Sequence, residues 1–134
     1  MPLFTWDASY SVGFSDYDDH HKHLFDLINQ LYDAMKLGKG NQELGKIVNN
    51  LVDYTNFHFS SEEARFTQYA YPETNKHRSE HTIFKAKIMD FKTKVDAGQI
   101  GLTVQVANFL KEWLLNHIKI EDKKYGPFLK SKGF

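Results

Sequence analysis

Apolar residues recur at three- and four-residue intervals along four successive stretches of the chain. This spacing places the apolar side chains of each stretch on one face of an α-helix. The stretches run roughly over residues 18–37, 42–69, 74–97 and 102–122. None of them alternates between apolar and polar residues as a β-strand does. Glycines or a proline lie between neighbouring stretches, so the connections are short. The pattern predicts an all-α protein, an up-down-up-down antiparallel four-helix bundle with N- and C-terminal extensions.

Aromatic residues at both ends of the chain are expected to fold back over this bundle. They are Phe4 and Trp6 near the N-terminus and Phe128 and Phe134 near the C-terminus. A chain of 134 residues has the size of one domain, at about 100–200 residues per domain. We therefore expect a single domain over residues 1–134.

The composition excludes several classes of protein. Lysine and arginine balance aspartate and glutamate at 17 each, whereas a strongly basic nucleic-acid binder needs clustered positive charge. The absence of cysteine excludes disulfides, thiolate metal sites and iron–sulfur clusters. No apolar run approaches the ~18 residues of a membrane span, and the first residues do not form a secretory signal. We expect a cytoplasmic protein that neither spans a membrane nor binds nucleic acid.

Histidine and phenylalanine are frequent, at 7 and 11 residues, which indicates a polar site within an aromatic core. Helical phase places five of the histidines and one glutamate on the apolar stripes. In an antiparallel bundle, the starts of the first and third helices lie level with the ends of the second and fourth. All six residues fall at that level: His21, His58, Glu62, His77, His81 and His117.

A single histidine on an apolar face is usually a hydrogen-bonded core residue. Five imidazoles and a carboxylate in one layer cannot all satisfy one another, and each unpartnered buried polar group costs about 1–3 kcal/mol. A bound metal satisfies them together, so the pattern predicts a metal site. His20 and His23 point off the apolar stripe and are expected to face solvent. Glu63 is expected to be exposed or to hydrogen-bond a ligand.

The residues around these positions resemble a known family. The chain has a tryptophan at position 6, Asp-Asp-His-His-Lys-His-Leu-Phe at 18–25, His-Phe-Ser-Ser-Glu-Glu at 58–63, His-Arg-Ser-Glu-His at 77–81 and His-Ile-Lys-Ile-Glu-Asp at 117–122. In this order and spacing they resemble the hemerythrin family, in its single-domain bacterial form, over almost the full length of the chain. The resemblance implies a non-heme di-iron protein. Its cofactors would be two iron ions (Fe2+/Fe3+) with a bridging oxo or hydroxo group, and O2 would be the ligand.

The resemblance also assigns the ligands, dividing five histidines between two irons that two carboxylates bridge. One iron takes His77, His81 and His117, the other takes His21 and His58 and binds O2, and the bridges are Glu62 and Asp122. At about six positions per iron, and with one bridging oxo or hydroxo group, this set leaves one position open. A single open position suits a small diatomic ligand.

For the second carboxylate, helix geometry and the resemblance favour different residues. Glu121 is four residues from His117 and shares its helix face. Asp122 is five residues from His117, about 140° around an ideal helix. Asp122 can bridge only if the backbone departs from a regular α-helix, as in a widened π-type turn. We expect that turn, with Asp122 as the bridge, Glu121 facing solvent, and the helix ending at Gly126-Pro127.

Apolar residues next to these ligands would exclude water from bound O2. By helical phase they are Leu24, Phe59, Trp113, Leu114 and Ile118. Ferritin-like di-iron oxidases use four carboxylates and paired Glu-x-x-His motifs, and this chain has no such motif. Its five neutral histidines and two carboxylates make a less anionic site. The sequence therefore favours reversible O2 binding, for storage, delivery or sensing, over an enzyme.

Two other functions compete with this one. The first is a di-iron oxidoreductase or peroxidase, or an enzyme that handles nitric oxide. The second is a structural metal bundle with no reactive ligand. We expect a monomer that binds O2 with at most weak peroxidase-like activity. If the protein delivers O2, the recipient would be an oxygen-consuming partner that the sequence does not identify.

Overall fold

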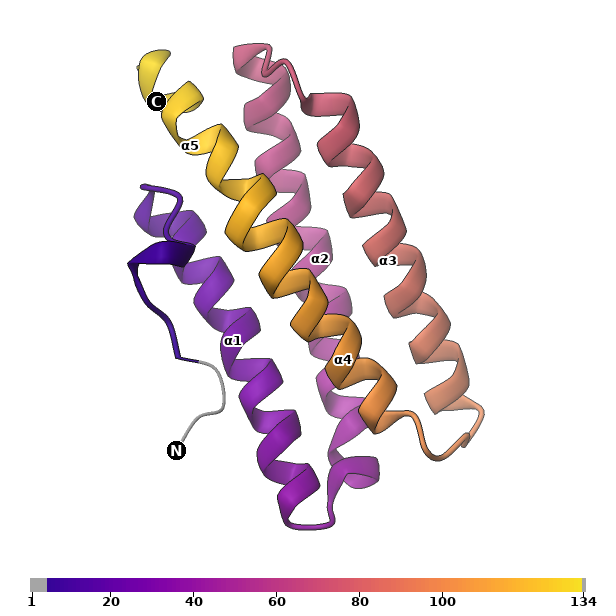
Figure 1. Cartoon of the computed structure of the whole chain (residues 1–134). Helices are drawn as coiled ribbons and strands as arrows, with labels where there is room; N and C mark the ends of the chain where they lie inside the picture. The colour runs from indigo at the N-terminus through magenta and orange to yellow at the C-terminus, as the bar shows by residue number, and fades with distance from the viewer. Residues whose placement is uncertain (1–4, 134) are drawn as a thin grey trace.

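The computed structural model describes residues 5–133, which fold into an antiparallel bundle of helices (Figure 1). A short 3-10 helix precedes the bundle. The bundle consists of four rods: α1, α2 and α3 form the first three, and a continuous run of α4, a π-helix and α5 forms the fourth. The elements are η1 (Ala8–Tyr10), α1 (Ser15–Lys36), α2 (Gly40–Tyr69), α3 (Thr74–Asp96), α4 (Thr103–Trp113), η2 (Leu114–Asp122) and α5 (Lys123–Ser131). The predicted four-helix bundle is confirmed, and residues 5–133 contain no strand. Within the same residues, no helix combines the length and the apolar character that crossing a membrane requires.

Local backbone geometry ends the helices where the chain reverses. Gly38 follows α1 with a φ of +71°, a left-handed conformation that glycine adopts at no steric cost. After α2, Ala70 takes the same region with a φ of 54°. The N–H of Tyr71 then donates to the carbonyl oxygen of Phe66 at 2.9 Å. Such turns satisfy carbonyl groups that are left over at a helix C-terminus, so each helix can return alongside the one before it.

The core consists of two apolar clusters along the axis of the bundle. α1 packs against α2 and α4, and α2 packs against α3. The larger cluster includes Leu24 and Phe84. The smaller cluster, which includes Tyr17, Phe66 and Tyr125, lies at the end where α1 begins and α2 finishes. A layer of polar residues separates the two clusters.

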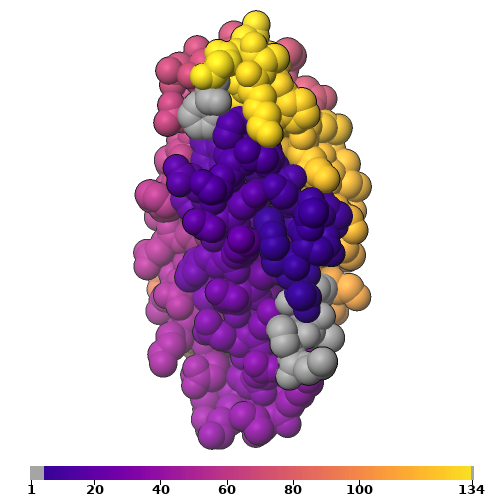
Figure 2. Space-filling view, turned by 90° about the vertical axis from the view of Figure 1, so that its left-hand side faces the viewer, coloured from indigo at the N-terminus to yellow at the C-terminus, as the bar shows by residue number. Residues whose placement is uncertain are grey.

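The N-terminal extension covers the seam between α1 and the fourth rod. The N-terminal segment lies across this seam in Figure 2, and η1 packs against η2. Trp6 meets Phe25 edge-on with ring centroids 5.4 Å apart, and Phe128 packs against the smaller cluster. The expected folding back is confirmed for Trp6. It is wrong for Phe128, because that residue lies in α5, which continues the fourth rod. Phe4 and Phe134 lie outside the described residues.

The expectation that the helix ends at Gly126-Pro127 is wrong, because α5 continues past both residues. A proline inside a helix removes one backbone hydrogen bond. Packing offsets that loss here, since Tyr125 and Leu129 on either side of the proline are fully buried. Gly126 also allows the N-terminal segment to approach closely. A Cβ atom at this position would lie 2.2 Å from the carbonyl oxygen of Val12.

Candidate metal centre

A layer of seven polar side chains crosses the bundle between the two apolar clusters. Each of the four rods contributes at least one of them, and none is more than 2% exposed. They are His21 from α1, His58 and Glu62 from α2, His77 and His81 from α3, and His117 and Asp122 from η2. The structure therefore brings together every residue that the sequence nominated as a metal ligand.

The ligand atoms of this layer form two groups. Within each group, one atom per residue lies within 4.8 Å of all the others. The first, called here the three-histidine group, contains Glu62, His77, His81, His117 and Asp122, and the second, the two-histidine group, contains His21, His58, Glu62 and Asp122. The two carboxylates belong to both groups.

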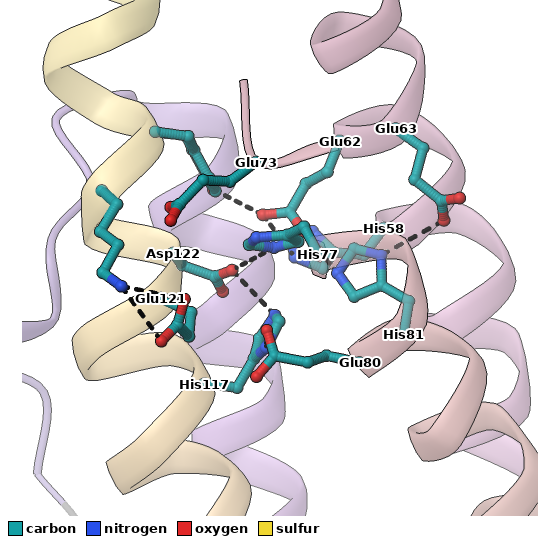
Figure 3. A network of polar contacts seen from close by, with 12 residues as sticks. His58, Glu62, Glu63, Glu73, His77, Glu80, His81, His117, Glu121 and Asp122 are labelled. Atoms are coloured by element: carbon teal, nitrogen blue, oxygen red, sulfur yellow. Dashed lines mark hydrogen bonds and ion pairs between the residues drawn. The ribbon is translucent and has the colours of Figure 1, made fainter. Parts of the chain in front are cut away.

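Asp122 turns one oxygen toward each group. Its Oδ1 lies 2.8 Å from Nε2 of His77 and 2.9 Å from Nε2 of His117. Its Oδ2 lies 3.1 Å from Nε2 of His21. Figure 3 shows the carboxylate of Asp122 directed at His77 and His117.

Glu62 divides its oxygens in the same way. Its Oε1 lies 3.2 Å from Nε2 of His81, and its Oε2 lies 3.3 Å from Nε2 of His58. The buried hydroxyl of Tyr125 donates a hydrogen bond of 2.5 Å to Oε2 and fixes the orientation of the carboxylate. Two carboxylates that each direct one oxygen to each histidine group have the geometry needed to bridge two metal ions.

The backbone that carries His117 and Asp122 is a π-helix, so the predicted widened turn is confirmed. The wider turn brings residues five apart onto one face, and the π-helix extends over nine residues rather than a single turn. Glu121 points away from the layer and pairs with Lys76 at 3.2 Å and Lys124 at 3.3 Å (Figure 3). Glu121 was expected to face solvent. It does point away from the layer, but only 14% of its side chain is exposed, because the two lysines cover it.

Six inward-facing atoms of the layer have no hydrogen-bond partner within the described residues. They are Nε2 of His77, His81 and His117, Oε1 of Glu62, and both carboxylate oxygens of Asp122. These atoms lie close together without hydrogen-bond geometry, which is the arrangement expected of lone pairs that converge on a shared ion. Imidazole and carboxylate are ligands for iron, zinc, copper and nickel. The donor set therefore fits a pair of metal ions.

Burial and mutual attraction shift the pKa values of these groups in opposite directions. Burial alone would raise the pKa of Glu62, yet the neighbouring histidines, His58 first, hold that pKa well below its usual range. Burial alone would lower the pKa of His77, but Asp122 and Glu62 raise it to about 10. The pKa of His117 is raised to about 9, because Asp122 outweighs burial there. A metal must therefore displace protons from this layer in order to bind.

Two of the histidines in the three-histidine group contact carboxylates through their outer nitrogens. Nδ1 of His81 lies 3.2 Å from Oε2 of Glu63, and Nδ1 of His117 lies 3.5 Å from Oε2 of Glu80. The contact with its histidine lowers the pKa of each glutamate. A carboxylate in this position orients a ligating imidazole and strengthens it as a ligand. Glu63 was expected either to be exposed or to hydrogen-bond a ligand. The structure shows the second alternative, with His81 as the partner.

His20 departs from its expected position in solvent. It is half-buried, and its Nδ1 lies 2.8 Å from Nδ1 of His58. The expectation was wrong because the ring of His58 reaches across the interface between α1 and α2, while Phe57 packs edge-on against His20 at 4.9 Å. His23 is exposed, as expected. If Nε2 of His58 binds a metal, its Nδ1 carries the proton and donates a hydrogen bond to Nδ1 of His20.

Apolar and aromatic side chains enclose the layer. Flat ring contacts join Phe59 to His81 at 3.8 Å, Trp113 to His117 at 3.8 Å and Tyr54 to His58 at 5.1 Å. The residues predicted to line the O2 pocket lie on the side of the layer that faces the larger cluster. Leu24, Phe59, Leu114 and Ile118 are buried in the larger cluster, and Trp113 packs against it.

Sequence reasoning missed three residues that contact the layer, namely Tyr54, Glu80 and Tyr125. Helical spacing could have found the two tyrosines, whereas Glu80 contacts His117 across two elements. Tyr54 precedes His58 by four positions, and Tyr125 follows Asp122 by three, which are the separations of neighbours on one helix face. Tyr54 and Tyr125 were overlooked because an aromatic residue at such a spacing is usually part of an apolar core.

Both the sequence and the fold match known proteins. The family model of the Hemerythrin HHE cation binding domain matches residues 12–129. The chain belongs to the hemerythrin family. A bacteriohemerythrin of Methylococcus capsulatus is 37% identical over 132 residues, covering 96% of this chain and 98% of the relative. A hemerythrin-like protein of Naegleria gruberi is 34% identical over 122 residues, covering 91% and 90%.

The solved structures give the same result for the fold. A crystal structure of a hemerythrin mutant aligns with a TM-score of 0.86 at 35% identity, covering 96% of this chain and 98% of that one. Membership in the hemerythrin family agrees with the buried layer, since the family model is named for a cation-binding domain and the layer is a group of potential metal ligands.

Proposed function

We propose that this hemerythrin-family protein holds two iron ions and binds O2 reversibly at one of them. The proposed ligands are His77, His81 and His117 for one iron, His21 and His58 for the other, and Glu62 and Asp122 as bridges. The observation that carries the proposal is that each buried carboxylate divides its two oxygens between the histidine groups. When bound, the irons, joined by a bridging oxo or hydroxo group, would supply the redox chemistry and one open position.

The two-histidine group is the proposed side for O2. Both groups share the two carboxylates, so the iron with fewer histidines is the one with a ligand position to spare. The apolar side chains of the larger cluster adjoin both groups and shield the layer as a whole, since Phe59 stacks on His81 and also contacts His58. Those proposed to line the O2 pocket are Leu24, Phe59, Leu114 and Ile118, together with Trp113 at the edge of the cluster.

The protein's own contribution to reversible binding is the exclusion of water and protons. O2 that has accepted electrons is committed to further reduction when protons reach it, and an apolar wall limits their access. Phe59 is 1% exposed, and Leu24, Leu114 and Ile118 are fully buried, so this wall is closed to solvent. Such an environment favours the release of O2 over its consumption.

We propose an oxygen-binding protein with at most weak peroxidase-like activity, rather than an enzyme. Five neutral histidines and two carboxylates leave two ferric ions with more residual positive charge than a four-carboxylate site does, which favours return to the ferrous state and loss of O2. The protein is proposed to act as a monomer that stores, delivers or senses O2, with an oxygen-consuming partner as the recipient.

The visible spectrum of the anaerobically reduced, iron-loaded protein tests this function. We expect two irons per chain, one for each group of ligands, and an absorption band that appears with air and disappears when O2 is removed. Sustained consumption of a reductant in air would instead support the alternative function, a di-iron enzyme. A spectrum that does not respond to O2, with zinc bound, would establish a structural metal bundle.

A matched pair of variants checks that the buried layer holds the iron. Glu62→Ala removes one proposed bridge and should lose most of the iron. Glu112→Ala removes an exposed carboxylate outside the layer and should keep it. Glu62→Ala protein that retains two irons per chain would refute the bridging assignment.

A further inference from the structure

Tyr54 places a hydroxyl group inside the apolar region that adjoins the two-histidine group. The residue lies on α2 one turn before His58, and the two rings are nearly parallel, with centroids 5.1 Å apart and 18° between their planes. Tyr54 is 6% exposed. Its hydroxyl oxygen is closed to solvent and has no hydrogen-bond partner within residues 5–133.

The surroundings of Tyr54 do not explain why this residue is a tyrosine. It belongs to the larger apolar cluster, together with Leu24, Phe59 and Leu114, and a phenylalanine would fill the same space. A buried hydroxyl without a partner destabilises the fold. The hydroxyl of Tyr125, in contrast, donates to Glu62. The hydroxyl of Tyr54 is therefore a donor left without an acceptor.

The position of the ring indicates what the acceptor is. Side chains four residues apart on a helix lie one above the other on the same face. The ring of Tyr54 thus extends beside that of His58 into the bundle, toward the side of the layer that the apolar wall covers. Nε1 of Trp113 is also buried without a partner within the described residues, but Trp113 stacks on His117 and so lies beside the three-histidine group, which has more ligands.

We propose that the hydroxyl of Tyr54 donates a hydrogen bond to the small ligand that binds in the two-histidine group, and that it favours ligands with an electron-rich acceptor atom. This inference rests on the proposed function, since it needs a metal with an open position beside His58. The class of ligand includes O2 after it has accepted electron density and small anions such as azide. A ligand without such an atom would gain nothing from Tyr54.

Azide binding to the oxidised, iron-loaded protein tests the role of Tyr54. Titration followed by visible absorption should give a dissociation constant roughly tenfold higher for Tyr54→Phe than for the unmodified protein, the effect of about one hydrogen bond. The matched control is Tyr10→Phe. It removes a hydroxyl from the same apolar cluster at a residue that packs on Phe25, away from the layer, and should leave the constant unchanged.

The infrared stretch of bound azide gives a second readout that a purely structural role of Tyr54 would not move. Its frequency, and its shift on exchange into D2O, should differ between Tyr54→Phe and the unmodified protein, and should be the same in Tyr10→Phe. Equal affinity and an equal azide band in all three proteins would overturn the role of Tyr54 while leaving the di-iron function intact. Failure of the unmodified protein to take up iron would overturn both proposals, whereas failure of the iron-loaded protein to bind azide would overturn only the role of Tyr54.

Discussion

Nε2 of His117 lies 2.9 Å from Oδ1 of Asp122, although the two residues are five positions apart in the sequence. In a regular α-helix these side chains would diverge by about 140°. The π-helix brings them together. Glu121, the residue before Asp122, is directed outward to Lys76 and Lys124. The irregular backbone therefore decides which of two adjacent carboxylates enters the buried layer.

This relationship predicts opposite outcomes for substitutions at adjacent positions. Asp122→Ala should lose most of the bound iron, because it removes an oxygen from each group of ligands. Glu121→Ala should keep the iron and lose less than about 1 kcal/mol of unfolding free energy, the usual contribution of a surface ion pair. Iron analysis and urea unfolding measure the two effects. Iron loss in Glu121→Ala with retention in Asp122→Ala would contradict the assignment.

The carboxylates behind His81 and His117 should strengthen metal binding. Glu63→Ala and Glu80→Ala each remove the carboxylate that contacts an outer histidine nitrogen. Each is expected to weaken metal affinity by about 10–100-fold, measured by competition with a chelator. The exposed Glu112 provides the control, since Glu112→Ala should bind as tightly as the unmodified protein. Unchanged affinity in both test variants would show that these contacts only support the fold.

The metal-free protein should lose stability as the pH rises above neutral. The pKa of His117 is raised to about 9 and that of His77 to about 10 in the folded protein, against about 6.5 for an ordinary histidine. A raised pKa contributes stability that is fully present below the unfolded value and is lost as the pH rises through the folded value. Urea unfolding of the metal-free protein should therefore show a decline between about pH 7 and 10.

The same histidines should give up protons when the metal enters. Both are protonated at neutral pH in the metal-free protein, and a ligating histidine must be neutral. Metal binding near pH 7 should therefore release a proton from each, detectable by calorimetry in buffers of different ionisation enthalpy. Metal uptake without proton release, combined with a flat stability profile, would show that His77 and His117 are neutral before the metal binds.

The hydrogen bond from Tyr125 to Glu62 should stabilise the metal-free fold. Tyr125→Phe keeps the ring in the smaller cluster and removes a buried bond to a charged group, which contributes about 1.5–3 kcal/mol. Tyr71→Phe is the comparison. It loses a bond of 3.2 Å to Glu73, a half-exposed residue, and should lose less. Equal losses in urea unfolding would place the effect of Tyr125 in its packing rather than in its hydroxyl.

Helical periodicity was sufficient to predict the bundle and the level at which five histidines and Glu62 meet. These features depend on the side-chain direction along regular helices, which the sequence spacing encodes. Asp122 could not be reached in this way, because ideal geometry favours Glu121. Its inclusion depended on a resemblance to known proteins and on a backbone irregularity that the resemblance requires.

The remaining differences come from contacts between elements that are distant in sequence. Helical phase correctly places His20 off the apolar stripe of α1, but it does not reveal that His58 of α2 reaches it. Pro127 is a poor residue inside a helix by its own chemistry, yet burial of Tyr125 and Leu129 keeps the helix intact. In each case packing against another element outweighs a local rule.

The order in which the layer can assemble follows from where its residues lie in the chain. His21 and Asp122 stand 3.1 Å apart although most of the polypeptide separates them, so joining them closes a very long loop, which costs more entropy than a short one. His58, Glu62, His77 and His81 instead occupy a single hairpin, α2 with α3. A newly made chain can therefore gather part of the donor set early and complete it only when its first and last helices dock. Under iron shortage, those two outer helices rather than the hairpin should be the first to open to proteases, which limited proteolysis of metal-free protein would reveal.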